Sequence, residues 1–461
     1  MSCSVVGSGL GRAAPGRQRA RGTVALLVAL VFLAALQAPG QPSAGLEDRL
    51  ARASAAFARG DWDAAEAHYR AALPEMAQAP SLLLKLAETS ARRGRGPEAL
   101  SWLERAAALG IGGIPPSLEG ALGTPTQATR WRAVRARLAR NREPLARGVV
   151  AFTLAERDLI PESVAFDPVD GAFYVGSLRK RKIVRVERSG HASDLVPTAR
   201  DGLWAVVGMK LHPTRRELWA NACSVATGPP MQPAEPESDG SGALFRFGLP
   251  DGRLLGRYSL SGAAQRVCFN DLVFAANGSA YLSSGPDGIY QLAPGAEPLR
   301  RLVAYDGIVN GIAASDDGRY LFLADQRRGV VRLEPATGAL LPLGVPPQAT
   351  LAGIDGLYVR GRTLAGIQNG LAGVPERALQ AWLDPGLGRA ECVAVLDRAH
   401  PAFDIPTTGV LVGSELYYVA SSQLSAFGPA QAPAAWERLH ESTVLRTPLL
   451  STCPGAPVAP K

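Results

Sequence analysis

A short phrase recurs six times in this chain, and it constrains the fold more than any other feature of the sequence. The copies cover residues 162–166, 207–211, 270–274, 310–314, 355–359 and 408–412. Their starting positions are therefore 45, 63, 40, 45 and 53 residues apart, close to the length of one four-stranded blade with insertions. Six phrases at this spacing predict a six-bladed β-propeller in which each phrase is the innermost strand of a blade.

The segments between the phrases have the composition of short strands and turns. From about residue 149 onward, β-rich stretches alternate with Gly, Pro and Asp, as in residues 162–186 and again in 308–333. We expect the propeller to span residues 150–430. The tail, 431–461, is expected to be either a closing strand or disordered.

Four of the phrases begin with an oxygen-bearing side chain: Glu162, Asn270, Asn310 and Asp355. Because the innermost strands of a propeller converge on its central channel, these four side chains should meet there. Two carboxylates and two amide oxygens are suitable ligands for one hard divalent cation, and their formal charge of −2 balances it. The alternative is that such polar residues hold a structural ion or water.

Residues 46–145 are expected to be helical, and within them residues 46–109 repeat with a period of 34. Gly60 matches Gly94, Ala65 matches Ala99, and Ala72 matches Ala106. This pattern resembles the tetratricopeptide repeat, with two repeats followed by a capping segment that runs through Arg142. The overall fold class is therefore mainly β with an α-helical N-terminal domain. The helical region either binds a protein partner on a concave surface or serves only as packing against the propeller.

Residues 1–45 resemble a targeting segment. Arg12, Arg17, Arg19 and Arg21 precede an apolar run over residues 23–36, which has the length of a signal-peptide core. We expect export to the periplasm or secretion, with an uncleaved membrane anchor as the alternative. These arginines supply four of the eight net positive charges, so the rest of the chain is only mildly basic and gives no indication of nucleic-acid binding.

Four cysteines follow the apolar run: Cys223, Cys268, Cys392 and Cys453. In an oxidising compartment they can pair in three ways, and buried free thiols remain an equal alternative. None has the CxxC spacing of a structural zinc site.

The motifs around residues 161–162, 269–272, 309–312, 315–318 and 354–356 resemble the SMP-30/gluconolactonase superfamily, to which paraoxonase-like propellers are related. The resemblance covers residues 158–427. It implies that Glu162, Asn270, Asn310 and Asp355 bind a catalytic ion, with calcium as our first choice and magnesium, manganese or zinc as alternatives. Two positions depart from the family. Cys268 and Phe269 stand where gluconolactonases place an Arg, and Val207 stands where paraoxonases place a catalytic His.

These residues predict an exported, metal-dependent hydrolase of a lactone or a related ester. Asp355 is the expected catalytic base, and Asp271, Val207, Cys268 and Thr408 are expected to contact substrate. The alternative is a non-catalytic protein in which the propeller and the helical repeat form a binding scaffold around a structural ion.

Overall fold

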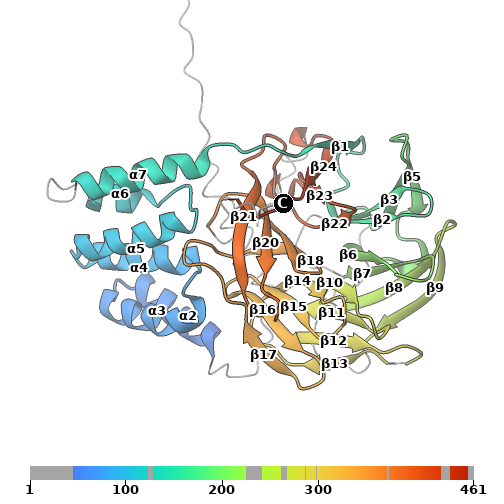
Figure 1. The fold of residues 1–461 in the computed structure, drawn as a ribbon, viewed down its shortest axis with the longest axis horizontal. Coiled ribbons are helices and arrows are strands. Elements are labelled where there is room, and N and C mark those ends of the chain that lie inside the picture. Colours follow the sequence, from blue (N-terminus) through green and yellow to red (C-terminus); the bar gives the residue numbers. More distant parts are fainter. Residues whose placement is uncertain are drawn as a thin grey trace, which may run out of the picture.

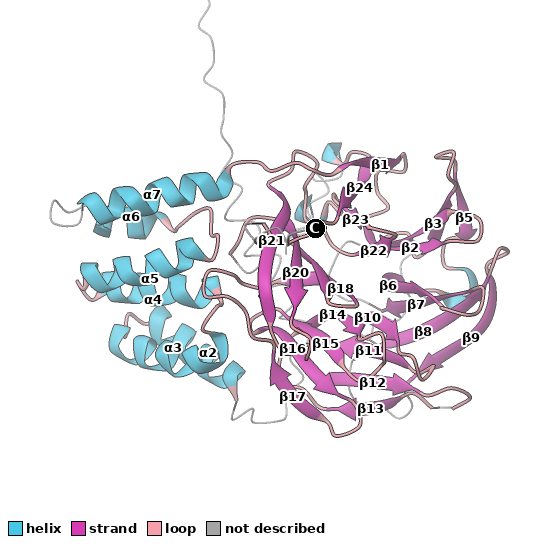
Figure 2. Cartoon of the chain, viewed as in Figure 1, coloured by secondary structure: helices cyan, strands magenta, loops and turns pink. Residues whose placement is uncertain are grey.

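The computed structural model describes residues 45–122, 128–224, 241–260, 267–285, 287–296, 298–370, 373–426 and 437–454. Helices form the first part of the chain and strands the second, and the two parts lie side by side (Figures 1 and 2). Residues 1–44, including the predicted targeting segment, lie outside the described residues. Within the described part, no helix is both long and apolar enough to cross a membrane.

The first part, here called the helical unit, is a stack of antiparallel helices. Its members are α2 (Leu46–Ala58), α3 (Trp62–Met76), α4 (Pro80–Arg92), α5 (Gly96–Ala108), α6 (Pro116–Leu122) and α7 (Ala128–Arg142). Gly60 and Gly94 end the first helix of their pairs with φ of +76° and +73°, a left-handed conformation that glycine adopts at little cost. This shared turn is the structural basis of the 34-residue period.

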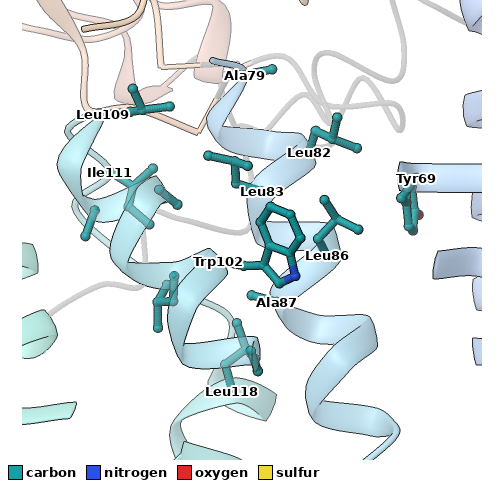
Figure 3. Packing of buried hydrophobic residues seen from close by; sticks show 14 of the residues in the cluster. Tyr69, Ala79, Leu82, Leu83, Leu86, Ala87, Trp102, Leu109, Ile111 and Leu118 are labelled. Carbon is teal, nitrogen blue, oxygen red and sulfur yellow. The ribbon is translucent and has the colours of Figure 1, made fainter. Parts of the chain in front are cut away.

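The core of the helical unit is built from alanines at the points where two helices touch and from larger apolar side chains beside these alanines. Ala65, Ala72, Ala99 and Ala106 are all fully buried. Figure 3 shows leucines of α4, including Leu83 and Leu86, beside Trp102 of α5. Because alanine lets two helices approach closely, the same alanine positions recur in both copies of the repeat.

The second part is a propeller of six antiparallel four-stranded sheets. The strands of the first three blades are β2 (Pro161–Asp167), β3 (Ala172–Ser177), β4 (Ile183–Val186), β5 (Ala192–Val196), β6 (Ala205–Leu211), β7 (Glu217–Cys223), β8 (Gly242–Gly248), β9 (Arg253–Ser259), β10 (Phe269–Phe274), β11 (Ala280–Ser284), β12 (Gly288–Leu292) and β13 (Arg300–Val303). Those of the next two are β14 (Val309–Ala314), β15 (Leu321–Asp325), β16 (Gly329–Glu334), β17 (Ala339–Pro342), β18 (Ile354–Arg360), β19 (Thr363–Gln368), β20 (Arg377–Leu383) and β21 (Ala390–Arg398).

The sixth blade closes the ring with strands from both ends of the propeller. Its order is β1-β24-β23-β22, where β1 is Val149–Leu154, β22 is Gly409–Val412, β23 is Glu415–Val419 and β24 is Ser442–Pro448. The boundary expected at residue 430 is therefore too early, because β24 lies in the predicted tail and forms the third strand of this blade. Pairing β1 with β24 removes a free sheet edge and locks the ring.

Two disulfides join the four cysteines, Cys223 to Cys268 and Cys392 to Cys453. This is one of the three pairings that the sequence allowed. The first links β7 to the segment that leads into β10, and the second ties β21 to the residues that follow β24.

Candidate metal centre

A β-bulge occurs at the same place in five of the six innermost strands. The pairing register shifts between residues 161 and 163 in β2, 206 and 208 in β6, 269 and 272 in β10, 309 and 312 in β14, and 354 and 357 in β18. A bulge leaves a residue unpaired and redirects its side chain. The displaced residues include all four predicted ligands, so the local backbone explains why these side chains leave the sheet at equivalent positions.

Glycines after the phrase starts allow the innermost strands to pack closely. A Cβ at Gly311 would lie 2.4 Å from the backbone oxygen of Asp355, and one at Gly208 would lie 2.5 Å from the backbone oxygen of Asn270. Gly356 similarly packs against the backbone of Thr407 and Thr408. At these three phrases a blade therefore approaches the next one closely, and glycine leaves room for this contact.

Three of the predicted ligands form a continuous hydrogen-bonded chain. Nδ2 of Asn270 donates to Oδ1 of Asn310 at 3.3 Å and to the backbone oxygen of Val309 at 2.7 Å. Nδ2 of Asn310 in turn donates to Oδ1 of Asp355 at 3.0 Å. Asn270 and Asp355, which are 85 positions apart in the sequence, are thus linked through Asn310 alone, as the propeller hypothesis required.

Glu162 completes the ring from the first blade. Its Oε2 is buried and has no hydrogen-bond partner among the described residues. Hydroxyl groups of Thr407 and Thr408 donate to its backbone oxygen at 3.0 and 2.9 Å, which fixes the start of β2 against the sixth blade. A buried carboxylate oxygen without a donor is costly, so this atom has unused capacity to bind a cation.

Burial and mutual repulsion make both carboxyl groups hard to ionise. The pKa of Glu162 is raised well above its usual value, first by burial and then by the charge of Asp355. Burial is also the main cause that raises the pKa of Asp355 to about 6, with a contribution from Asp271, while hydrogen bonds from Asn369 and Asn310 oppose the rise. A divalent cation between the two groups would remove this repulsion and replace a proton.

The ring fits a hard divalent ion by its donor set. Its side chains offer carboxylate and amide oxygen atoms as ligands: Oε2 of Glu162 is buried and unpaired, and the carbonyl oxygen of Asn270 accepts no hydrogen bond within the described ranges. No three His, Cys, Asp or Glu side chains gather into a metal-binding group in the part of the chain that the structure describes. Amide carbonyl oxygens, like carboxylates, are ligands that calcium accepts.

Asp271 lies next to Asn270 but faces a different environment. It is 2% exposed, and its carboxylate pairs with Nζ of Lys210 at 3.1 Å and accepts the backbone N–H of Leu272 at 2.8 Å. The ammonium of Lys210 also lies 5.2 Å from the centre of the Tyr358 ring. Asp271 is therefore part of a buried ion pair, and its contact with a substrate stays a prediction.

A cavity of about 440 Å³ lies at the opposite mouth of the channel, where the innermost strands end. Lys210, Ile312, Tyr358 and Leu411 are among its lining residues. It is thus on the far side of the ion pair from the candidate metal centre. We assign the centre from the ring of ligands and not from this cavity.

The other predicted substrate contacts have structural partners. Val207 packs with Ile160 and Leu178 in an apolar cluster, and Cys268 is bonded to Cys223. Thr408 is 6% exposed and donates to Glu162 as described. Whether any of them contacts a substrate stays a prediction.

Sequence reasoning missed Asn369, which follows the end of β19. Its Nδ2 donates to Oδ2 of Asp355 at 3.1 Å. The repeated phrase could not reveal it, because it lies outside the innermost strands. A signal was nevertheless present: four of the six second strands end on polar residues, Ser177, Ser284, Asp325 and Gln368. A polar residue at that end of a second strand lies close to the start of the innermost one.

Comparison with known proteins gives structural neighbours only. No protein-family model and no curated protein sequence matches the chain. A gluconolactonase from Xanthomonas campestris is 17% identical, with 65% of this chain and 89% of that chain covered and a TM-score of 0.41. The calcium-binding protein regucalcin from Agrobacterium tumefaciens is 15% identical, with 66% and 97% covered and a TM-score of 0.44. Virginiamycin B lyase from Staphylococcus aureus is 10% identical, with 67% and 100% covered and a TM-score of 0.44.

The chain folds as a six-bladed β-propeller. Its structural neighbours include gluconolactonase and regucalcin structures. The likeness extends to the fold alone, and the blade count rests on the strand pairing described above.

Proposed function

We propose that this protein is a metal-dependent hydrolase of a lactone or related ester, and that Glu162, Asn270, Asn310 and Asp355 hold one divalent ion. The observation that carries the proposal is the pair of buried carboxyl groups with raised pKa values, one of them with an oxygen that has no partner. Calcium is the first choice, because a ring of two carboxylates and two amides supplies only oxygen atoms; magnesium, manganese and zinc are the alternatives.

A bound ion of this kind would polarise the substrate carbonyl and lower the pKa of a water molecule. The protein's own contribution is to place Asp355 as the base that accepts the proton of that water. Burial raises the pKa of Asp355 to about 6 without the ion, and a cation beside the carboxylate would lower it, so Asp355 would be ionised and able to accept a proton at neutral pH. Hydrogen bonds from Asn310 and Asn369 to its two oxygens keep the carboxylate from rotating.

A panel of lactones and aryl esters tests the proposal, assayed with purified protein before and after metal removal. We expect hydrolysis that is lost on chelation and restored by adding back one divalent ion. The Asp355→Asn variant should lose at least ~100-fold in kcat. Asp251→Asn, at an exposed turn, is the matched control and should keep full activity. Hydrolysis that survives complete metal removal would overturn the proposal.

A second candidate function, a binding scaffold with a structural ion, is favoured by two positions. Val207 packs in an apolar cluster and Cys268 is held in a disulfide, so neither supplies a reactive group beside the ring. The helical unit would then present the surface for a protein partner. This candidate predicts metal binding without turnover of any ester or lactone, and an Asp355→Ala variant that loses metal and stability only.

We also propose that the protein is exported, to the periplasm or beyond. The two disulfides support this, because such bonds persist in oxidising compartments. Cell fractionation tests it, with protease accessibility of the intact protein as a second measurement. Recovery of the protein in the cytoplasm, with free thiols, would contradict export.

A further inference from the structure

The helical unit joins the propeller at the face where the innermost strands begin, which is also the face of the metal ring. Nε2 of Gln78 donates to the backbone oxygen of Pro346, in the segment that leads into β18, at 3.0 Å. Arg328, in the turn between β15 and β16, pairs with Glu75 at 3.0 Å. Figure 1 shows the helices stacked along the side of the propeller nearest β16, β20 and β21.

These contacts involve the blades that carry Asn310 and Asp355. The turn between β15 and β16 lies beside the start of β14, and the connection between β19 and β20 lies beside the start of β18. At Gly112, which follows α5, a Cβ would lie 3.1 Å from Cγ of Pro375 in the latter connection. The helical unit therefore supports the loops around two of the four ring residues.

Asn369 begins the connection between β19 and β20 and braces Asp355. Its side chain donates to Oδ2, while Asn310 donates to Oδ1, so each carboxylate oxygen has its own donor. Asn369 is only 4% exposed. Groups that hydrogen-bond to a metal-binding carboxylate orient it and tune its affinity.

A buried arginine connects Asn369 to the helical unit. Arg377, the first residue of β20, is 6% exposed, and its Nε donates to Oε1 of Gln368, the neighbour of Asn369. On its other side the guanidinium packs against Gly110, just after α5, where a Cβ would lie 2.6 Å from Nη1. Gly110 has φ of +103°, so both its conformation and its lack of a side chain accommodate Arg377.

We propose that the helical unit is a positioning element of the metal centre, acting through Arg377 and Gln368 on Asn369, which orients Asp355. Asn369 is a positioning residue in this scheme, because it touches a ligand and not the substrate. The inference deepens the proposed function, since it concerns the same ring. It also gives the helical unit a role other than peptide binding.

The test measures affinity of the full chain for calcium, magnesium, manganese and zinc by titration calorimetry, and uses the ion that binds tightest. Asn369→Ala should weaken binding by roughly 10- to 100-fold, the usual effect of losing a group that orients a ligand. Asn277→Ala is the control, because this asparagine also makes a side-chain hydrogen bond in a propeller turn, by accepting the backbone N–H of Ser279, but lies away from the ring. Equal affinity in Asn369→Ala and wild type would overturn the inference.

A pair of glycine variants tests the link to the helices. Gly110→Ala and Gly94→Ala both place a side chain at positive φ in the helical unit, but a Cβ at Gly94 meets nothing within 4 Å. We expect both variants to lower the melting temperature of the metal-free protein, and only Gly110→Ala to weaken ion binding, by roughly 3- to 10-fold. Equal affinities in the two variants would show that the helices do not position the site. A wild-type protein that binds none of the four ions would instead overturn the proposed function itself and this inference with it.

Discussion

Nζ of Lys210 lies 3.1 Å from Oδ1 of Asp271 within the propeller channel, one residue beyond the metal ring along β10. The carboxylate is almost completely buried and the lysine side chain is 20% exposed. Burial raises the pKa of Asp271, while the lysine opposes the rise. Lys210 thus supplies a positive charge from the second blade, whose innermost strand, β6, carries none of the predicted metal ligands.

The Lys210→Met variant should be destabilised by about 3–5 kcal/mol at pH 7, because it leaves Asp271 buried without its partner. Urea unfolding at equilibrium measures this change. The loss should be smaller at pH 5, where a buried carboxyl with a raised pKa becomes neutral at less cost.

The double variant Lys210→Met with Asp271→Asn provides the control. The neutral asparagine can still accept the backbone N–H of Leu272, so the double variant should be more stable than Lys210→Met alone. A double variant that is less stable than both single ones would contradict a destabilisation caused by the unpaired charge.

The sequence predicted that the starts of the repeated phrases converge, because a repeat carries this information, whereas metal binding by the ring stays a prediction. Glu162, Asn270, Asn310 and Asp355 occupy equivalent positions, and a closed propeller brings equivalent positions together whatever the lengths of the intervening loops. The hydrogen bonds from Asn270 to Asn310 and from Asn310 to Asp355 agree with this reasoning. Likewise, the 34-residue period predicted the turns at Gly60 and Gly94.

The parts that were not predicted depend on contacts between unrelated segments. Asn369 lies in the connection after a second strand, and Lys210 pairs with Asp271 of the neighbouring blade, so the alignment of the phrase starts reveals neither contact. The sequence left two alternatives for the tail, a closing strand or disorder, and β24 is the closing strand. The repeat could not decide between them, because residues 442–448 form a single short strand with no second copy to compare. Each of these three features depends on tertiary contacts between different strands or loops.

The metal-free protein should be more stable at pH 5 than at pH 8. The folded-state pKa values of Glu162 and Asp355 are raised, so between about pH 4 and their folded-state values the native state binds more protons than the unfolded state. The free energy of unfolding therefore falls as the pH rises through that range. For Asp355, a rise from 3.8 to about 6 corresponds to on the order of 3 kcal/mol.

Thermal unfolding at pH 5 and pH 8 after metal removal measures this dependence. The Asp355→Asn variant should show a flatter profile, because it removes one of the two charges. If calcium is the native ion, adding it should stabilise the wild type more at pH 8 than at pH 5, since fewer protons compete. A metal-free wild type that gains stability steadily from pH 5 to pH 8 would contradict the raised pKa values.

Gly311→Ala should damage the metal centre through the backbone. A Cβ there would lie 2.4 Å from the oxygen of Asp355 and 2.7 Å from the nitrogen of Leu357, and neither can move without shifting β18. We expect a loss of ~1–3 kcal/mol in unfolding free energy, together with weaker ion binding. Gly248→Ala is the control, because its nearest neighbour is a mobile leucine side chain at 3.6 Å. Equal ion affinity in the two variants would show that β14 and β18 need not pack this closely.

The two disulfides should differ in their effect on ion binding. Each closes a long loop, 45 residues for Cys223–Cys268 and 61 for Cys392–Cys453, so loss of either should cost about 4 kcal/mol by loop entropy. Only the first lies beside the ring, because Cys268 is two residues before Asn270. A Cys223→Ser/Cys268→Ser protein should therefore lose both stability and ion affinity, whereas Cys392→Ser/Cys453→Ser should lose stability alone. Calorimetric titration of both proteins with the ion, well below their melting temperatures, measures the two affinities. An equal loss of affinity in the two proteins would mean that the first disulfide has no specific role in holding Asn270.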